Sequence, residues 1–381
     1  MSGKLHVGLF TGSSITTFGG GERYIIELSN ELKMKGIDVT IFTQGHGRKE
    51  NMNIEQIRKM TEADIKPFRC IYTKATPTIP FFKYRDFSKL DCIYNMDESI
   101  FTNGFLQFYA KIKHIKYIYG MHIPKSFLFG NESAENNLKR KLWKLYRIPL
   151  IAFFKAFVVV IHVINIEQQN AIRSIGYDNR IFHIPDFVTL NRQKIGSNSS
   201  EFIVLFTGAL NIEIKGIDLL ADIISMVLNK NQKVKFVITG SPGNGTEFIW
   251  NLTKRYEKNV SYLGFISEED LDLLHKKASL FVFTSRIDSF SLGIVGAQCY
   301  GLPCVAFDIA GPNDILTERF QGSVIPDFDT EKFCQKILHY YDEWSAHPEE
   351  YGELKEEIRD NIYNRLGKEV IIPKIIDMFS Q

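Results

Sequence analysis

The part of this sequence that most constrains its fold is residues 280–316, where an apolar run leads through an acid-containing turn into a helix of small residues. Residues 280–283 predict a buried strand, residues 290–300 the helix, and residues 305–307 a second buried strand. Gly301 is typical of the position just after a helix. A strand that leads into a helix N-terminus presents free backbone N–H groups, so this stretch predicts an anion site.

Length and composition bound the class of protein. A chain of 381 residues exceeds one ordinary hydrophobic core, so we expect two domains, and an apolar share of 44% is typical of globular proteins. The formal net charge of +2 gives no support for a nucleic-acid partner. The five cysteines are scattered without a Cys-x-x-Cys pair, which predicts free thiols in a reducing compartment rather than disulfides or zinc ligands.

The N-terminal residues predict neither export nor membrane insertion. They lead directly into an apolar strand, without a signal-peptide core or a cleavage site. The longest apolar region, residues 148–164, is interrupted by Lys155 and His162 and falls short of a spanning helix. We therefore expect a cytoplasmic protein.

Strand and helix patterns alternate along the chain. Residues 5–10 predict a strand, residues 11–21 a glycine-rich loop, and the following residues a helix that is closed by Gly36. Further apolar runs predict strands at residues 39–42, 92–94, 116–119, 158–163, 181–184, 202–206, 234–238 and 261–263. Strands that alternate with helices form parallel sheets with helices on both faces.

A polar, serine-rich stretch without periodicity, residues 191–200, predicts a linker between two domains. The N-terminal domain is expected over residues 1–190 and the C-terminal domain over residues 201–366. A helix of about residues 367–381 is expected to pack back on the N-terminal domain. The predicted fold class is α/β, with two doubly wound Rossmann-like domains that face a cleft, and such sheets bind ligands at the carboxyl ends of their strands.

Two features of the N-terminal domain fall at that edge. Gly19, Gly20 and Gly21 are consecutive, so they do not match the spaced glycines of the dinucleotide fingerprint. They fit a mobile turn or a loop over a ligand, and their place after the first strand favours the loop over a ligand. His122 follows a predicted strand, where its position at the ligand edge offsets the more common structural role of a lone histidine.

Three features of the C-terminal domain converge on the same kind of edge. Gly208 follows a strand, Lys215 starts a helix, and Asp288 precedes the small-residue helix. Taken alone, Lys215 fits a surface lysine and Asp288 fits a helix N-cap. Together, a cation, helix-end amides and a carboxylate suit a sugar nucleotide, with phosphates on the first two and sugar hydroxyls on the third.

Six motifs in this order carry a resemblance that covers nearly the whole chain. They are Phe18-Gly19-Gly20-Gly21, His122, Thr207-Gly208, Lys215-Gly216-Ile217-Asp218, Tyr262-Leu263-Gly264-Phe265-Ile266-Ser267, and residues 285–303 with their serine, acid, phenylalanine, small helix and Gly-Leu-Pro. Together they resemble the GT-B glycosyltransferases, and among them the large retaining family 4.

The resemblance implies transfer of a sugar from a nucleotide sugar to a carbohydrate or lipid-linked glycan acceptor, with retention of configuration and without a metal or other cofactor. It implies catalytic roles for His122, Asp288 and Lys215, and an acceptor-side role for the glycine loop. It places the donor near Gly208, Gly264, Gly296 and the backbone N–H groups of Phe290, Ser291 and Leu292.

Two positions depart from the family pattern. Gly296 stands where the family has its second signature glutamate, and Ala209 stands where it has an arginine six residues before the lysine. Loss of two charged hydrogen bonds to a donor corresponds to about two to four orders of magnitude in affinity. The alternative is therefore a binding or partner subunit that keeps the fold with weakened or lost catalysis; a sugar-nucleotide epimerase of the same fold ranks third.

Residues 138–147 predict a helix in which leucines and aromatic residues alternate with five basic residues. Such a helix fits either peripheral binding to an anionic membrane or an ordinary packed helix with a solvated basic face.

Vesicle sedimentation separates these two interpretations. If the helix binds lipid, anionic vesicles sediment the protein, and neutralising Lys139, Arg140 and Lys144 releases it, because the attraction to anionic headgroups is lost. If the helix is a packed one, neutral and anionic vesicles sediment the protein equally.

Overall fold

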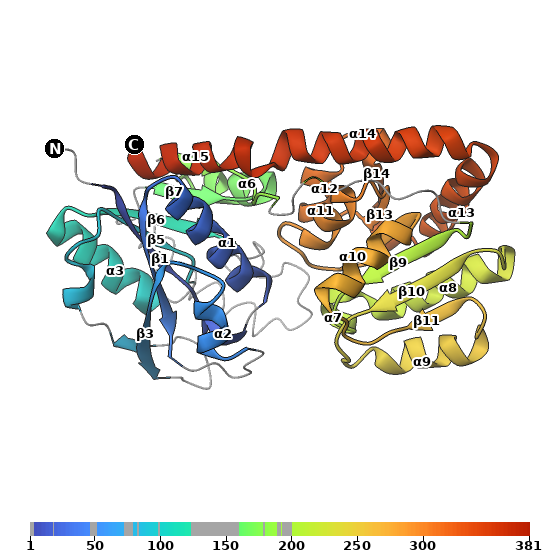
Figure 1. Ribbon diagram of the computed structural model, residues 1–381, viewed down its shortest axis with the longest axis horizontal. Coiled ribbons are helices and arrows are strands. Elements are labelled where there is room, and N and C mark those ends of the chain that lie inside the picture. Colours follow the sequence, from blue (N-terminus) through green and yellow to red (C-terminus); the bar gives the residue numbers. More distant parts are fainter. Residues whose placement is uncertain are drawn as a thin grey trace. The chain divides into compact units, whose positions relative to one another are not determined.

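The structure is a computed structural model of the chain. It describes residues 4–17, 19–45, 52–71, 79–81, 84–97, 100–122, 160–177, 180–188, 192 and 200–381. The predicted basic helix at residues 138–147 and most of the predicted linker lie outside these residues. The chain forms two compact units, one of Met1–Phe187 with Lys368–Gln381 (unit 1) and one of Val188–Gly367 (unit 2), drawn in Figure 1. The second unit thus begins at Val188, before the predicted linker.

Unit 1 is built on an eight-stranded sheet in the order β4-β3-β2-β1-β5-β6-β7-β8, in which every pair is parallel except β3 with β4. The strands are β1 His6–Phe10, β2 Asp38–Gln44, β3 Asp64–Ile71, β4 Ile79–Phe81, β5 Cys92–Asn95, β6 Lys116–Met121, β7 Val160–Val163 and β8 Arg180–His183. The helices are α1 Gly20–Met34, α2 Ile54–Arg58, α3 Ile100–Lys113, α6 Ile166–Ser174 and α15 Lys368–Ser380, with short 3-10 turns at Ile15–Thr17 and Tyr84–Phe87.

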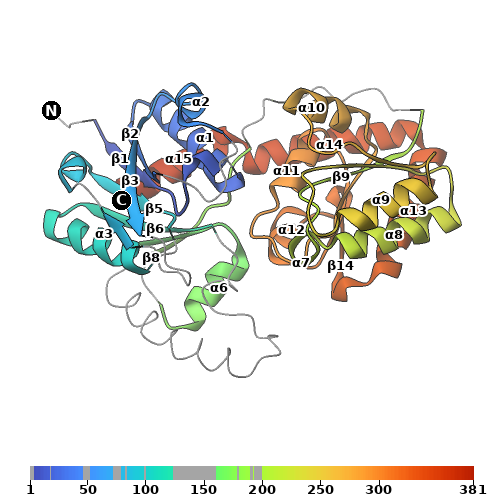
Figure 2. The same cartoon turned by 90° about the horizontal axis from the view of Figure 1, so that it is seen from below.

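Helices cover both faces of this sheet (Figure 2). On one face, α1, α2 and α15 pack on β1 through a core that includes Val7, Leu9, Ile25 and Ile375. On the other face, α3 and α6 enclose an aromatic core in which the rings of Phe10 and Phe42 stack at 4.4 Å. Burial of the apolar face of α15 explains why the last helix of the chain belongs to the first unit.

Unit 2 contains a six-stranded, fully parallel sheet in the order β11-β10-β9-β12-β13-β14. The strands are β9 Ile203–Thr207, β10 Lys235–Thr239, β11 Val260–Tyr262, β12 Leu280–Phe283, β13 Cys304–Phe307 and β14 Gly322–Ile325. The helices are α7 Ile212–Lys215, α8 Ile217–Lys230, α9 Thr246–Arg255, α10 Glu268–Lys277, α11 Leu292–Cys299, α12 Ala310–Ile315, α13 Thr330–Ala346 and α14 Pro348–Leu366, with 3-10 turns at Arg319–Gln321 and Pro326–Phe328.

The predicted α/β class and the doubly wound sheets are confirmed. Three strands were not predicted, and one helix boundary was predicted wrongly. No apolar run predicts β3, which contains Pro67, the short β4, or the edge strand β14. Lys215 was predicted to start a helix, but it is the last residue of the single turn α7. Gly216 then adopts a left-handed conformation, with φ of 61°, before α8 begins.

Four of the five cysteines, Cys92, Cys299, Cys304 and Cys334, are buried free thiols. Within the described ranges, no cluster of His, Cys, Asp and Glu side chains could hold a metal ion. None of the helices that the structure describes has both the length and the hydrophobicity needed to cross a bilayer.

The most unusual buried charge in unit 2 is Lys355 on α14, whose side chain is almost completely enclosed. Its Nζ donates one hydrogen bond, of 3.3 Å, to the carbonyl of Ala278. Burial lowers the pKa of Lys355 from 10.5 to about 8, because the charged form has lost its water.

Replacement of Lys355 by methionine should therefore stabilise the protein. Between pH 8 and 10.5 the unfolded chain holds a proton that Lys355 has released in the native protein. The contribution of Lys355 to stability therefore rises with pH in this window and is least favourable below pH 8. We expect Lys355→Met to raise the free energy of unfolding at pH 7 by about 1–3 kcal/mol, and to do so much less at pH 10.5. Urea unfolding at both pH values measures this, with the exposed Lys254→Met as the matched control; equal gains at both pH values would contradict the expectation.

Candidate functional site

Glycines follow three neighbouring strands of unit 2 at their carboxyl ends: Gly208 after β9, Gly240 after β10 and Gly264 after β11. All three have positive φ, of 153°, 144° and 68°. A Cβ on Gly240 would lie 1.9 Å from the carbonyl oxygen of Gly208, so the backbones approach too closely for any other residue. The result is an edge of bare backbone at the predicted donor positions Gly208 and Gly264.

Lys215 is held at the same edge by the loop that follows β12. The Thr284 hydroxyl donates to the carbonyl of Lys215 (2.9 Å), and the N–H of Arg286 donates to the carbonyl of Ile214 (2.8 Å). A Cβ on Gly216 would lie 2.3 Å from the Thr284 carbonyl oxygen, so a glycine after the lysine is required for this close approach. The Lys215 ammonium lies 5.2 Å from the centre of the Phe283 ring.

Arg286 strengthens this connection, and sequence reasoning missed it. Its guanidinium makes two parallel hydrogen bonds of 2.7 Å to the carboxylate of Asp218 and a third, of 2.6 Å, to the carbonyl of Ile212. The hydrogen bonds from Arg286 lower the pKa of Asp218. Because a bidentate pair fixes both position and orientation, Arg286 ties α7 and the start of α8 to the β12–α11 loop.

Asp288 lies beside Lys215, with its Oδ2 3.2 Å from the lysine Nζ. Its Oδ1 accepts hydrogen bonds from the N–H groups of Phe290 (3.1 Å) and Ser291 (2.5 Å). These two N–H groups were predicted to face the donor, and in this structure the protein's own carboxylate occupies them. The correction has a local cause, since aspartate side chains commonly bond N–H groups two and three residues on.

The next two N–H groups, those of Leu292 and Gly293, are the first of α11. They have no hydrogen-bond partner among the described residues. Ser291, at φ of 66°, turns the chain into the helix, and its carbonyl accepts from Ile294 and Val295. Of the three predicted amides, Leu292 therefore remains available, and Gly293 joins it. They lie at the positive end of an eight-residue helix, where an anion is stabilised.

Gly296 lies one turn further along α11. A Cβ built at this position has no other atom within 4 Å, so the structure has open space where the family has its second glutamate. Ala209 is exposed at the loop after β9. Neither position supplies a charged side chain to the edge.

In unit 1, the predicted glycine loop forms the N-terminus of α1. Gly19 is the N-cap residue and Gly20 the first residue of the helix. The N–H of Gly19 donates to the carboxylate of Glu22 (2.8 Å), which also accepts from the hydroxyl of Ser13. Gly21 has open space where a side chain would begin, whereas Phe18 lies outside the described residues. Glu22, which sequence reasoning did not select, is therefore the group that caps this loop.

His122 follows β6, as predicted, but its ring nitrogens face other side chains of unit 1. Nε2 lies 2.6 Å from the hydroxyl of Tyr94, and Nδ1 lies 3.3 Å from Oδ1 of Asp186. A Cβ on Gly120 would lie 2.6 Å from that same hydroxyl, so a glycine in β6 makes room for Tyr94. The ring of Tyr24 packs at 4.8 Å on the ring of His122.

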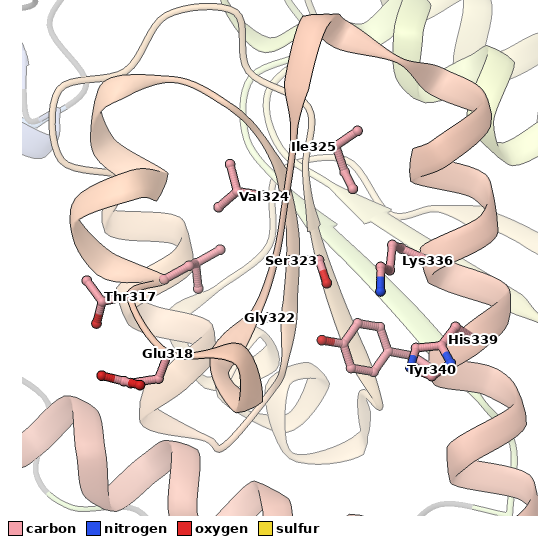
Figure 3. A pocket seen from close by; sticks show the side chains of 10 residues that line it. Thr317, Glu318, Gly322, Ser323, Val324, Ile325, Lys336, His339 and Tyr340 are labelled. Atoms are coloured by element: carbon pink, nitrogen blue, oxygen red, sulfur yellow. The ribbon is translucent and has the colours of Figure 1, made fainter.

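A pocket in unit 2, shown in Figure 3, contains none of the predicted site residues. Tyr340 projects from α13 toward the edge strand β14, and Lys336 and His339 line the same side. The other lining residues are Leu316, Thr317, Glu318, Gly322, Ser323, Val324 and Ile325.

Two family models match the chain. The model described as Glycosyl transferases group 1 matches residues 187–365, and the model described as Glycosyltransferase Family 4 matches residues 18–192. Their boundary falls close to the division between the two units.

Similar characterised proteins match this chain at identities of 30% and 22%. Poly(ribitol-phosphate) alpha-N-acetylglucosaminyltransferase of Staphylococcus aureus is 30% identical over 44% of this chain, which spans only 33% of that protein's length. The gpi3 subunit of phosphatidylinositol N-acetylglucosaminyltransferase of Schizosaccharomyces pombe is 22% identical over 85% of this chain and 71% of its own.

Solved structures share the fold at low identity. TarM superimposes with a TM-score of 0.74 at 16% identity over 99% of both chains. A sucrose-phosphate synthase of Thermosynechococcus elongatus gives 0.73 at 16% identity, again over 99% of both chains. With one family model on each half and this shared architecture, the chain belongs to the GT-B glycosyltransferases of group 1, with an N-terminal half of the family 4 type.

Proposed function

We propose that the protein transfers a sugar from a nucleotide-sugar donor to an acceptor hydroxyl, with retention of anomeric configuration and without a metal. The observation that carries this proposal is the Lys215–Asp288 pair, 3.2 Å apart, beside the unpartnered N–H groups of Leu292 and Gly293. This arrangement supplies a cation and two amides for a diphosphate, and a carboxylate for sugar hydroxyls, on neighbouring atoms of one edge.

The difficult step in this reaction is departure of the nucleoside diphosphate, because negative charge develops on its leaving oxygen. Lys215 and the amides of Leu292 and Gly293 stabilise that charge, and Arg286 and Gly216 already fix the segment that carries Lys215. The acceptor hydroxyl forms the new bond on the face that the diphosphate leaves, and the departing phosphate takes its proton. This is the front-face route by which configuration is retained.

The nucleotide and the acceptor belong to the same proposal. The bare backbone of Gly208, Gly240 and Gly264 allows a flat base and a ribose to approach β9, β10 and β11. UDP-sugars come first among donors, because similar solved structures carry UDP and UDP-glucose. The acceptor is a carbohydrate or lipid-linked glycan, which the loop of Gly19, Gly20 and Gly21 and His122 in unit 1 would meet.

A second function is favoured by Gly296 and Ala209. Without the carboxylate and the guanidinium that the family has there, the same fold would serve as a binding or partner subunit with little turnover. A panel of nucleotide sugars tested by thermal shift, followed by assay of nucleoside diphosphate release, separates the two functions. Stabilisation with turnover supports the enzyme, whereas stabilisation of no donor contradicts it.

Variants at Lys215 and Asp288 test the donor site directly. Each contributes a charged interaction of about 1.5–3 kcal/mol, so Lys215→Ala and Asp288→Asn should each lower kcat/KM by about 10–150-fold. Asparagine keeps an oxygen for the N–H groups of Phe290 and Ser291, which separates loss of charge from loss of the loop structure. The exposed Lys254→Ala is the control, and undiminished turnover in both site variants would remove the basis of the proposal.

Restoring a carboxylate at position 296 should strengthen donor binding. The structure has room for the side chain, so Gly296→Glu is expected to lower the Kd of the nucleoside diphosphate by about 10–100-fold through the ribose hydroxyls. Calorimetry with the ribonucleotide and its 2′-deoxy analogue measures the gain, which should shrink for the analogue. Gly296→Ala fits the same space without an acceptor and should change nothing; equal gains for both nucleotides would refute a ribose contact.

A further inference from the structure

A chain of four polar side chains, those of His162, Tyr94, His122 and Asp186, crosses the interior of unit 1. The Ile184 carbonyl lies 2.7 Å from Nε2 of His162, whose Nδ1 lies 2.7 Å from the Tyr94 hydroxyl. That hydroxyl lies 2.6 Å from Nε2 of His122, and Nδ1 of His122 faces Asp186 at 3.3 Å. The residues come from β5, β7 and the segments that follow β6 and β8, so the sheet itself brings them together.

At the Ile184 end of this chain, the donor and the acceptor of the hydrogen bond are unambiguous. A backbone carbonyl accepts hydrogen bonds and never donates them, so Nε2 of His162 carries a hydrogen. His162 is completely buried, and burial together with the nearby His122 lowers its pKa to about 3. His162 is therefore neutral at pH 7, and its Nδ1 is a bare acceptor.

The donor and acceptor of each remaining hydrogen bond, up to His122, follow from this assignment. Because Nδ1 of His162 can only accept, the single hydrogen of the Tyr94 hydroxyl points toward it. The Tyr94 oxygen must then accept from its other neighbour, so Nε2 of His122 carries a hydrogen. The buried hydroxyl of Tyr24 forms no hydrogen bond among the described residues, so it leaves this order unchanged.

Asp186 alone would impose the opposite order. A carboxylate beside Nδ1 favours a hydrogen on that nitrogen, as in the carboxylate–histidine pairs that orient an imidazole. Asp186 is buried, and its Oδ1, 3.3 Å from Nδ1 of His122, forms no hydrogen bond among the described residues. Two influences therefore compete for the tautomer of His122, and His162 acts through Tyr94 on Nε2.

We infer that Tyr94 and His162 are positioning residues that fix the Nε2–H form of His122 and leave Nδ1, facing Asp186, as the ring nitrogen without a hydrogen. This inference rests on the proposed function, in which His122 belongs to the transfer site. It deepens that proposal, because Nε2 of His122 has its hydrogen committed to Tyr94 and is unable to take a proton from the acceptor. The leaving phosphate then remains the base, and His122 acts through the position of its ring.

Nitrogen NMR reads the tautomer whether or not the protein turns over any donor. In protein labelled with ¹⁵N-histidine, with His122 assigned from His122→Gln, Nε2 of His122 should show the shift and the one-bond coupling of a protonated nitrogen. His162 should be neutral and protonated on Nε2 at pH 7. A bare Nε2 on His122 would overturn the inference.

The sharpest variant is His162→Phe, which removes the acceptor for Tyr94. The freed hydroxyl hydrogen then turns to Nε2 of His122, and Asp186 draws the imidazole hydrogen to Nδ1, so the tautomer should switch. His162→Leu gives the same result if the larger ring does not fit. Tyr24→Phe, which removes a buried hydroxyl from the same cluster, is the matched control and should leave the tautomer unchanged. An unswitched tautomer in folded His162 variants would also overturn the inference.

Turnover provides a separate measurement. Where the wild-type protein releases nucleoside diphosphate, His162→Phe should lower kcat about tenfold or more with little change in the donor KM, and should shift the pH profile, because a tautomer change leaves the donor edge of unit 2 intact. A wild-type protein that lacks turnover would contradict the proposed function and leave the NMR result to decide the tautomer. Unchanged kcat and pH profile in a variant whose tautomer has switched would refute the link to the reaction.

Discussion

The first turn of a helix carries backbone N–H groups that no carbonyl of the same helix can reach, and both candidate edges of this protein depend on how those groups are satisfied. At α1 the carboxylate of Glu22 accepts from Gly19. At α11 the carboxylate of Asp288 accepts from Phe290 and Ser291, while Leu292 and Gly293 are left over. In each unit an acid from the chain itself neutralises part of the positive helix end, and what remains determines which anion the edge can bind.

Most of the fold could be predicted because buried parallel strands are continuous apolar runs, and those of β1, β9, β12 and β13 are unmistakable in the sequence. Edge positions lose this signal. β3 tolerates Pro67 and charged residues, and β14, Gly322–Ile325, is buried only at Ile325, because a strand at or near the margin of a sheet needs less apolar surface. The helix predicted to start at Lys215 begins at Ile217 instead, because Gly216 separates α7 from α8 by its backbone conformation, which leaves no mark in the apolar pattern.

Some residues of the candidate site could be predicted from local sequence motifs, whereas others depend on contacts between distant parts of the chain. Lys215, Asp288 and the glycine loop could be selected because each stands in a recognisable motif beside a strand end. The residues that support these sites could not be selected, because the sheet order alone brings them close. Tyr94 and His162 lie 28 and 40 residues from His122 along the chain, and Arg286 lies 71 residues from Lys215, whose turn it supports through Ile212 and Asp218. The pairing of Asp288 with Phe290 and Ser291 could have been predicted, because that turn is local.

The ion pair between Lys215 and Asp288 has a consequence for a protein surrounded by small anions. A free lysine beside a helix N-terminus would attract inorganic phosphate as readily as a diphosphate ester. Here Asp288 acts as an internal counter-ion, so an entering anion must displace a carboxylate that is held by Lys215 and two amides. A simple phosphate offers nothing to the displaced carboxylate, whereas a sugar nucleotide brings hydroxyls that bind it. Under the proposed function, the Lys215–Asp288 ion pair therefore disfavours simple phosphate relative to a sugar nucleotide before any base is recognised.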